Sequence, residues 1–345
     1  MDPHLPAAEP PPVLALDIGG TKLAVGVVTP DGRVHGWQSA PTRREEGPEA
    51  VLTRLFDLGR KAVAEAGRLT VGAVGISCGG PLDAAAGVVQ SPPHLPGWAD
   101  VPVRALASEA FEVPAVLEND ATAGALAEFR HGAGRGTATM VYLTVSTGVG
   151  GGTVVGGRLH RGAAGNGGEL GHLVVRPGGR RCACGRLGCV EAYASGTAIA
   201  GRAREALAEG RPSSLAALPA PTARDVGEAA AAGDPLAVEI WDESVRALGA
   251  AVTDLVNVFE PDLVVLGGGV ARAGERLIGP VAAMVAREAM PPAARAARVV
   301  RAELGAAVCV VGAGAVAHDF LAAPTGATGS AHPAAVSGTS GTNHA

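Results

Sequence analysis

Residues 140–155, MVYLTVSTGVGGGTVV, predict an apolar strand (140–145), a glycine turn (146–152) and a returning strand (153–155). Residues 13–28, VLALDIGGTKLAVGVV, have the same order of strand, glycine turn and strand, so we interpret the two segments as an internal repeat. Two similar lobes, each with one glycine hairpin, could hold the phosphates of one nucleotide between them. A G-x-G-x-x-G dinucleotide turn is the alternative, but the β-branched residues at 153–155 favour a strand where that turn would open a helix.

Predicted helices and strands alternate along the rest of the chain. Apolar residues at helical spacing indicate long helices over 49–66 and 235–259. Shorter helices are predicted over 104–111, 121–129 and 312–320, and strands over 71–77, 115–117, 262–266 and 308–311. The alternation favours α/β layering.

Length and composition limit the class of protein. A chain of 345 residues is long for one core and predicts two domains. The net charge of −5 argues against non-specific binding of nucleic acid. We see no uninterrupted apolar run of about 18 residues, so no membrane helix is expected. The first dozen residues lack the basic and apolar regions of a signal peptide, and the cytoplasm is the expected compartment.

The domain boundaries follow from these patterns. We expect a disordered tail at 1–12, an N-terminal α/β lobe at 13–118, a C-terminal α/β lobe at 119–311, a helix at about 312–320 that returns to the N-terminal lobe, and a second disordered tail at 323–345.

Two glycine turns admit both a structural and a functional interpretation. Asp17-Ile18-Gly19-Gly20-Thr21-Lys22 can be a tight hairpin, or a phosphate clamp with Asp17 near a metal and the Lys22 ammonium on phosphate. Gly267, Gly268 and Gly269 can be a plain strand-to-helix turn, or can let an adenine and a ribose lie against bare backbone. The residues alone leave both alternatives open.

Asn119 and Asp120 lie between a predicted strand and an Ala-rich helix. Asp is a good N-cap, which is the structural interpretation. A carboxylate at such a junction can also serve as a general base for a hydroxyl group. His94, in a Pro-rich turn, is interpreted as a loop residue, with a place in the lining of a pocket as the lesser alternative because other candidate site residues are nearby.

A cluster of metal-binding residue types follows. His172, Cys182, Cys184 and Cys189 supply one imidazole and three thiolates, which fill the four positions of a structural zinc ion and leave none open for catalysis. Three of the chain's five cysteines are in this cluster. Glu169 precedes the cluster and Glu191 follows it, so a zinc loop would also position carboxylates.

The order of these motifs resembles the ROK family of sugar kinases, within the actin-like (ribonuclease H-like) ATPase superfamily. The resemblance covers about residues 13–320. Its motifs are Asp17–Lys22, Leu95-Pro96-Gly97-Trp98, Glu118-Asn119-Asp120, Thr147–Gly152, Glu169-Leu170-Gly171-His172, the cysteine segment 182–191 and Leu266–Gly269. It implies a two-domain α/β fold with a cleft between the lobes.

The resemblance also implies an activity and residue roles. The reaction would transfer phosphate from ATP, with Mg²⁺, to the 6-hydroxyl of a hexose, with glucose as the first choice and N-acetylmannosamine, N-acetylglucosamine or fructose as alternatives. Asp120 would be the general base. The implied sugar ligands are Asn119, Asp120, Glu169, His172 and Glu191. The implied nucleotide ligands are Asp17, Gly19, Gly20, Thr21, Lys22, Thr147, Gly148, Gly267, Gly268 and Gly269.

The sequence departs from the family pattern at three positions. The frequent Pro-Gly-Pro loop is Gly79-Gly80-Pro81, the usual Asn before Leu-Pro-Gly-Trp is His94, and a frequent second Asn is Thr122. By the resemblance, the first two are expected in a loop that helps shape the sugar pocket. A repressor of the same family would carry a DNA-binding domain of some tens of residues, for which the 12 residues before the first strand leave no room. A sugar-sensing regulator without DNA binding stays an alternative, and a homodimer or higher homo-oligomer is expected.

Overall fold

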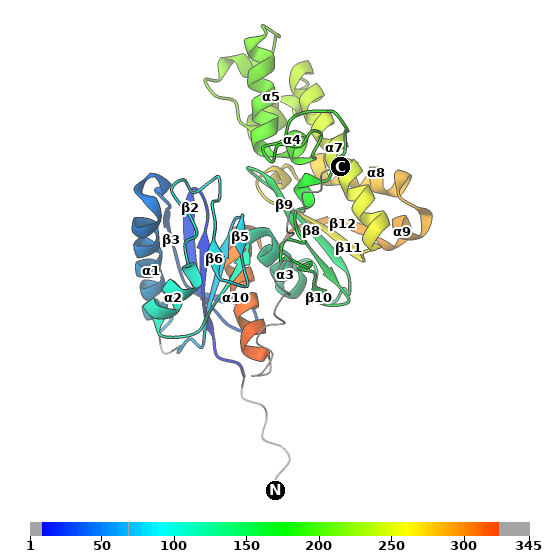
Figure 1. Ribbon diagram of the computed structural model, residues 1–345. Coiled ribbons are helices and arrows are strands. Elements are labelled where there is room, and N and C mark those ends of the chain that lie inside the picture. The colour runs from blue at the N-terminus through cyan, green and yellow to red at the C-terminus, as the bar shows by residue number, and fades with distance from the viewer. Residues whose placement is uncertain (1–8, 68, 324–345) are drawn as a thin grey trace, which may run out of the picture.

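The computed structural model describes residues 9–67 and 69–323, which form two five-stranded mixed sheets side by side (Figure 1). Most of the predicted tails, 1–12 and 323–345, lies outside the described residues. The α/β prediction is confirmed, because each sheet is covered by helices on both faces.

The first sheet has the strand order β3-β2-β1-β4-β7. Its strands are β1 (Val13–Ile18), β2 (Lys22–Val28), β3 (Val34–Pro41), β4 (Val74–Cys78) and β7 (Ala115–Asn119). β1, β2 and β3 pair antiparallel, whereas β1, β4 and β7 pair parallel. Helices α1 (Gly47–Glu65) and α2 (Val103–Phe111) bury one face of this sheet, and α10 (Val308–Ala322) buries the other.

The second sheet has the order β10-β9-β8-β11-β12. Its strands are β8 (Met140–Val145), β9 (Val149–Val155), β10 (Arg158–Leu159), β11 (Leu263–Gly267) and β12 (Arg298–Arg301). The pairing repeats that of the first sheet, with three antiparallel strands followed by two parallel additions. Two hairpins in equivalent places are what the predicted internal repeat requires. Helix α3 (Asp120–His131) packs on one face, and α7 (Pro235–Phe259) with its neighbours packs on the other.

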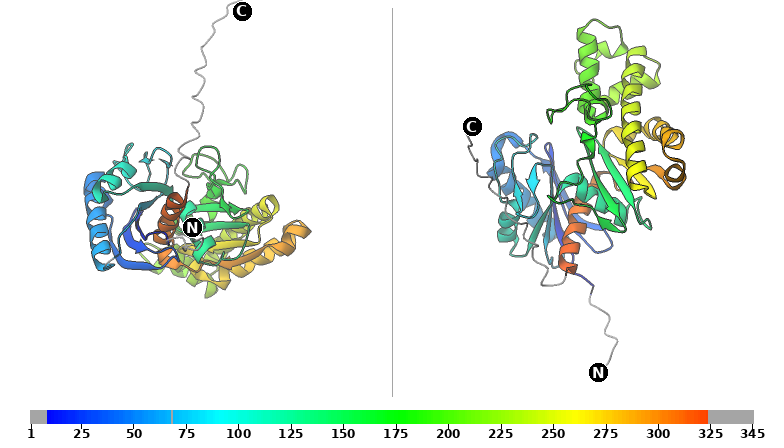
Figure 2. Two further views of the ribbon diagram at one scale, coloured as in Figure 1. Left: turned by 90° about the horizontal axis from the view of Figure 1, so that it is seen from below. Right: turned by 45° about the vertical axis from the view of Figure 1, so that its right-hand side comes forward.

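Helices α3 and α10 fill the space between the two sheets (Figure 2). They approach closely because small residues meet at the crossing: a Cβ on Gly312 would lie 2.3 Å from the backbone oxygen of Ala123. α10 is apolar nearly all round, as expected of a helix that is covered on both sides. The window Gly305–Ala322 is long and apolar enough to cross a membrane by composition, but half of it is buried inside the protein.

The remaining elements extend the C-terminal half or connect strands. The short strands are β5 (Leu82–Asp83) and β6 (Val88–Val89). The helices are α4 (Glu191–Ala194), α5 (Gly196–Ala208), α6 (Ala223–Ala231), α8 (Glu275–Glu288) and α9 (Pro291–Ala296). The 3₁₀ turns are η1 (Arg44–Glu46), η2 (Leu170–His172), η3 (Ser214–Ala217), η4 (Val270–Ala273) and η5 (Gly305–Ala307).

Two sequence predictions need correction. The strand predicted over 308–311 is wrong, because helix α10 begins at Val308. A short apolar run has the same periodicity in a buried strand and in a buried helix. The second glycine turn also ends earlier than predicted, because β9 begins at Val149. The next three glycines lie inside this strand, where a Cβ on Gly152 would be 2.6 Å from the Cβ of Ala125 in α3.

We predict that Gly312→Ala destabilises the protein despite the higher helix propensity of alanine. The added methyl group must displace the α3 backbone, and overpacking of this kind costs about 1–3 kcal/mol of unfolding free energy. Gly201→Ala is the matched control, because Gly201 is also helical but a Cβ added there would have nothing within 4 Å. The free energy of unfolding of Gly201→Ala should be about 0.5–1 kcal/mol higher than that of the unchanged protein. Urea denaturation of both variants tests this, and a midpoint for Gly312→Ala at or above that of the unchanged protein would contradict it.

Candidate active site

A cavity of about 740 Å³ lies at the carboxyl ends of the parallel strands, between the two sheets. In open α/β sheets this edge is where ligands bind. The cavity brings together most of the predicted site residues. Those that line it are Gly19, Gly20, Thr21, Asp120, Thr147, Gly148, Glu191, Gly267, Gly268 and Gly269.

Both glycine hairpins present backbone to this cavity. In the first, the Gly19 amide donates to the Lys22 oxygen at 3.1 Å, and a Cβ on Gly19 would lie 2.7 Å from that oxygen. In the second, the Ser146 amide donates to the Gly148 oxygen at 2.8 Å. Each turn is therefore a close backbone loop, which is the geometry that lets amide groups approach phosphate.

Lys22 does not line the cavity. Its ammonium lies 5.6 Å from the ring centroid of Trp37, in a cation–π contact on β3. The guanidinium groups at the cavity belong instead to Arg44, Arg272 and Arg301, which the sequence interpretation did not single out. No short motif surrounds these three arginines, and only the fold brings them together.

Asn119, and not Asp120, is the N-cap of helix α3. The Asn119 Oδ1 accepts from the amides of Ala121 at 3.0 Å and Thr122 at 3.1 Å. The capping interpretation of Asp120 is therefore wrong. Asp120 is the first helical residue, and its side chain reaches the cavity. Burial raises the pKa of the Asp120 carboxyl above its usual range.

Asp17 ends β1 beneath the first glycine turn. The Ser77 hydroxyl donates to its Oδ1 at 2.6 Å. Burial raises the pKa of Asp17 to about 7, the Ser77 hydrogen bond opposes this shift, and the charge of Asp120 adds to it. A cation near Asp17 would stabilise the ionised carboxylate, so this residue fits the neighbourhood of a metal although it is not part of the cavity lining.

The four predicted metal ligands converge. One ligand atom of each of His172, Cys182, Cys184 and Cys189 lies within 4.8 Å of all the others. The Cys182 Sγ is 3.6 Å from the His172 Nδ1, and the Cys184 Sγ is 3.7 Å from the Cys189 Sγ. Ligands of a tetrahedral zinc ion are roughly 3.3–3.8 Å apart, so this group could hold such an ion.

Two carboxylates flank this metal-binding group. The His172 Nε2, on the far side of the ring from Cys182, lies 3.6 Å from the Glu169 carboxylate. Such a contact orients a metal-bound imidazole. The Glu191 Oε2 accepts from the Val149 amide at 2.9 Å, and its Oε1 lies 3.5 Å from the Cys182 Sγ. Glu191 therefore joins the metal-binding group to the second glycine turn.

The predicted sugar ligands are only partly brought together. Asp120 and Glu191 line the cavity, whereas Asn119, Glu169 and His172 do not. The side chain of Glu169 is 57% exposed, on the segment that leads to η2. His94, by contrast, lines the cavity, as its place near the other candidates had suggested.

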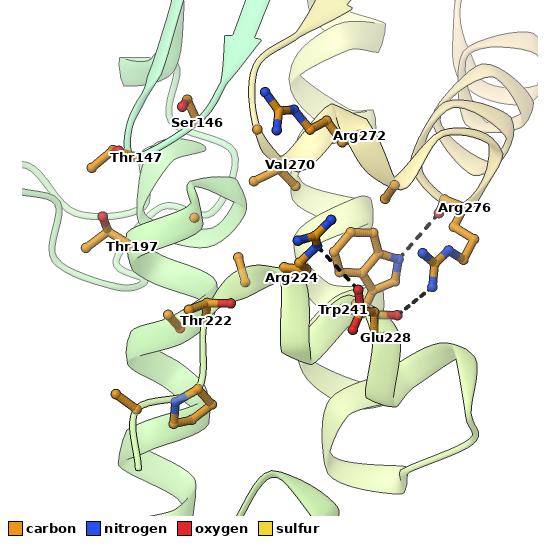
Figure 3. Close-up of a pocket in the computed structure, with 18 of the residues that line it drawn as sticks. Ser146, Thr147, Thr197, Thr222, Arg224, Glu228, Trp241, Val270, Arg272 and Arg276 are labelled. Carbon is orange, nitrogen blue, oxygen red and sulfur yellow. Dashed lines mark hydrogen bonds and ion pairs between the residues drawn. The ribbon is translucent and has the colours of Figure 1, made fainter. Parts of the chain in front are cut away.

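A second cavity of about 700 Å³ adjoins the first (Figure 3). The two share Ser146, Thr147, Gly269 and Arg272. Figure 3 shows Ser146, Thr147 and Thr197 along one side and the Trp241 indole at the other, with its Nε1 donating to the Arg276 oxygen at 3.4 Å. The sequence interpretation missed this cavity, because its lining comes from several helices and connections spread over residues 146–276.

Comparisons with known proteins agree with this architecture. A family model described as the ROK family matches residues 13–320. A glucokinase from Thermotoga maritima is 37% identical, over 90% of this chain and 98% of that protein. An N-acetylmannosamine kinase from Escherichia coli is 36% identical, over 75% of this chain and 84% of that protein. The crystal structure of a ROK family glucokinase from Streptomyces griseus, in complex with glucose and AMPPNP, has a TM-score of 0.74 and 34% identity, covering 89% of this chain and 99% of that chain.

We predict that Asn119→Ala lowers the unfolding free energy by about 1 kcal/mol, because it removes the side-chain acceptor of the Thr122 amide and one of two acceptors of the Ala121 amide, which also donates to the Asp120 Oδ1 at 2.8 Å. Asn119→Ser, which keeps a capping oxygen, should restore most of the loss. Asp120→Ala should lower the unfolding free energy by less than Asn119→Ala does. Chemical denaturation of the three variants decides this, and the reverse order of Asn119→Ala and Asp120→Ala would show that Asp120 is the cap after all.

Proposed function

The chain belongs to the ROK family, whose proteins have the two-lobe actin-like fold. We propose that it is an ATP-dependent hexose kinase that phosphorylates the 6-hydroxyl of glucose. The observation that carries this proposal is the convergence of a partly buried carboxylate, Asp120, with two glycine turns at one cavity. A carboxylate suits proton removal from an alcohol, and the turns suit a nucleotide's phosphates.

In the proposed reaction Asp120 accepts the proton of the sugar 6-hydroxyl as that oxygen attacks the γ-phosphorus. The bond from the γ-phosphorus to the β,γ-bridging oxygen breaks, and ADP leaves with that oxygen. The backbone of Gly19–Lys22 and Thr147–Gly148 would hold the phosphates. The Mg²⁺ that accompanies ATP supplies positive charge against the phosphate oxygens, and Asp17 is its candidate protein partner. Positioning and charge stabilisation supply most of the catalysis in such reactions.

The second cavity is the proposed adenosine site. It begins at Gly269 and the Ser146–Thr147 turn, so a nucleotide whose phosphates lie at that turn would extend its base toward Trp241. This supports the interpretation of Gly267–Gly269 as backbone close to adenosine over a plain strand-to-helix turn.

The ligand set at His172, Cys182, Cys184 and Cys189 supports a structural zinc ion. Three sulfurs and one nitrogen leave no open position, so the ion would act by holding segment 169–191 together. Through Glu191 this segment contacts the second glycine turn, because the Glu191 carboxylate accepts a hydrogen bond from the Val149 amide. Asn119, Glu169, His172 and Glu191 are the proposed sugar ligands beside Asp120.

Other features remain proposals from the family resemblance. N-acetylmannosamine, N-acetylglucosamine and fructose are the alternative acceptors, and a sugar-sensing regulator without turnover is the alternative function. A coupled ADP-release screen over these sugars separates them, because only a kinase shows sugar-dependent turnover. We also propose a homo-oligomer, a cytoplasmic location and a division into lobes at 13–118 and 119–311. Because the returning helix begins at Val308, the second lobe would end at 307 and not at 311.

We predict that Asp120→Asn lowers kcat by about 10²–10⁴-fold, because the amide keeps the size of the side chain but accepts no proton. Glucose affinity should stay within about tenfold. The kcat/KM of the unchanged protein should fall as the pH drops through the raised pKa of Asp120, at a higher pH than for an ordinary carboxyl. Asp57→Asn, an exposed change on α1, is the matched control. Near-normal turnover of Asp120→Asn would refute the assignment.

We predict one zinc ion per chain, and its loss in Cys184→Ser. The variant should show faster hydrogen exchange over residues 169–191 and a lower denaturation midpoint, since metal-binding energy contributes to folding energy here. Cys309→Ser changes a cysteine outside the group and should keep its zinc. Elemental analysis that finds no zinc in the unchanged protein, or equal zinc in Cys184→Ser, would overturn this proposal.

A further inference from the structure

The turn that carries His94 is firmly anchored. On its C-terminal side the side chains of Leu95 and Trp98 are buried in the core of the first sheet, at 1% and 3% exposure. The Leu95 amide donates to the Pro92 oxygen at 2.9 Å, which closes the turn. His94 is therefore held in place between a buried neighbour and the cavity that it lines.

The imidazole of His94 lies against two glycines. A Cβ on Gly79 would be 2.5 Å from its Cε1 and 2.9 Å from its Nε2. A Cβ on Gly20 would be 3.0 Å from the His94 Cβ and 3.2 Å from its Cδ2. Contacts this short mean that any side chain at position 79 must move the ring. The departures from the family pattern at positions 79 and 94 therefore depend on each other, because the glycine at position 79 leaves room for the imidazole ring at position 94.

The ring lies on the Asp120 side of the cavity. His94 and Asp120 line the same cavity, and a Cβ on Gly80, next to the glycine that contacts the ring, would be 3.8 Å from the Nδ2 of Asn119, the neighbour of Asp120. In agreement, the charge of Asp120 raises the pKa of His94, and the charge of His94 lowers that of Asp120. Burial has the larger effect and keeps the pKa of His94 below its usual value, which leaves a neutral ring with one donor and one acceptor. Within residues 9–67 and 69–323 the ring has no hydrogen-bond partner, and only the His94 backbone oxygen accepts a hydrogen bond, from Arg44 at 3.4 Å.

We propose that the imidazole of His94 binds the 4-hydroxyl of the hexose, and that the lack of a side chain at Gly79 leaves room for this imidazole. The inference rests on the proposed function: when Asp120 holds the 6-hydroxyl, the 4-hydroxyl is the neighbouring sugar hydroxyl that a group beside Asp120 can reach. A polar group that is built to bind one hydroxyl rejects a sugar that lacks it, because the buried partner is then left unpaired. His94 is therefore a specificity residue for the acceptor.

The test compares glucose with 4-deoxyglucose and 3-deoxyglucose in steady-state kinetics. For His94→Ala we expect the glucose KM to rise about tenfold, the loss of one hydrogen bond, with kcat within about twofold. The preference of the unchanged protein for glucose over 4-deoxyglucose should largely disappear, whereas its preference over 3-deoxyglucose should remain. A purely structural role for His94 would change both preferences alike.

The second variant tests the contact with Gly79. Gly79→Ala should displace the ring and reproduce the kinetic changes of His94→Ala. In the double variant the two effects should not add, because the second change has no ring left to move. If His94→Ala does not fold, Gly79→Ala decides the proposal through the same two deoxy sugars.

Two outcomes overturn the inference. The first is that His94→Ala keeps the preference for glucose over 4-deoxyglucose. The second is that the effects of His94→Ala and Gly79→Ala on the glucose KM add in the double variant. Failure of the proposed function has a different result, since the unchanged protein would then release no ADP with any sugar. A failed His94 assignment leaves that turnover intact.

Discussion

The close crossing of α3 and α10 is the contact on which the rest of the arrangement depends. Gly312 in α10 lies against the Ala123 backbone in α3, so the two helices act as one layer between the sheets. α10 is fixed to the first sheet, α3 to the second, and Asp120 is the first residue of α3. The crossing therefore sets the distance between the two glycine hairpins and places the carboxylate between them.

A second set of contacts joins the metal-binding group to the cavity. Glu191 receives a hydrogen bond from the Val149 amide and lies beside Cys182, and a Cβ on Gly148 would be 2.7 Å from its Oε2. One carboxylate thus contacts the thiolate group, the second glycine turn and the cavity. Disturbance of the cysteine segment would reach the turn through the Glu191 side chain.

Sequence periodicity and spacing predicted what local rules determine. The long helix matches 235–259 because its apolar residues keep one face over many turns, and the His–Cys spacing found four residues that converge in space. The failures depend on tertiary contacts. The run 308–311 is helical because a sheet and a helix cover it on both sides. Lys22 points away from the cavity because it stacks on Trp37 of a neighbouring strand. The contact between Gly79 and His94 joins two loops. No local pattern contains that information.

Helix α10 also constrains how the chain can fold during synthesis. One apolar face of the first sheet, which includes Val13, Ala15 and Val28, is covered by Ala313 and Ala317 from the far end of the described chain, and His318 lies 3.2 Å from the Val28 oxygen. The first lobe emerges early from the ribosome but keeps this face open until the last helix follows. These contacts join residues almost 300 positions apart, so they can form only after the second lobe has been synthesised. A stop codon shortly before residue 308 would therefore leave the first half of the protein unfinished, and not only shorten its end.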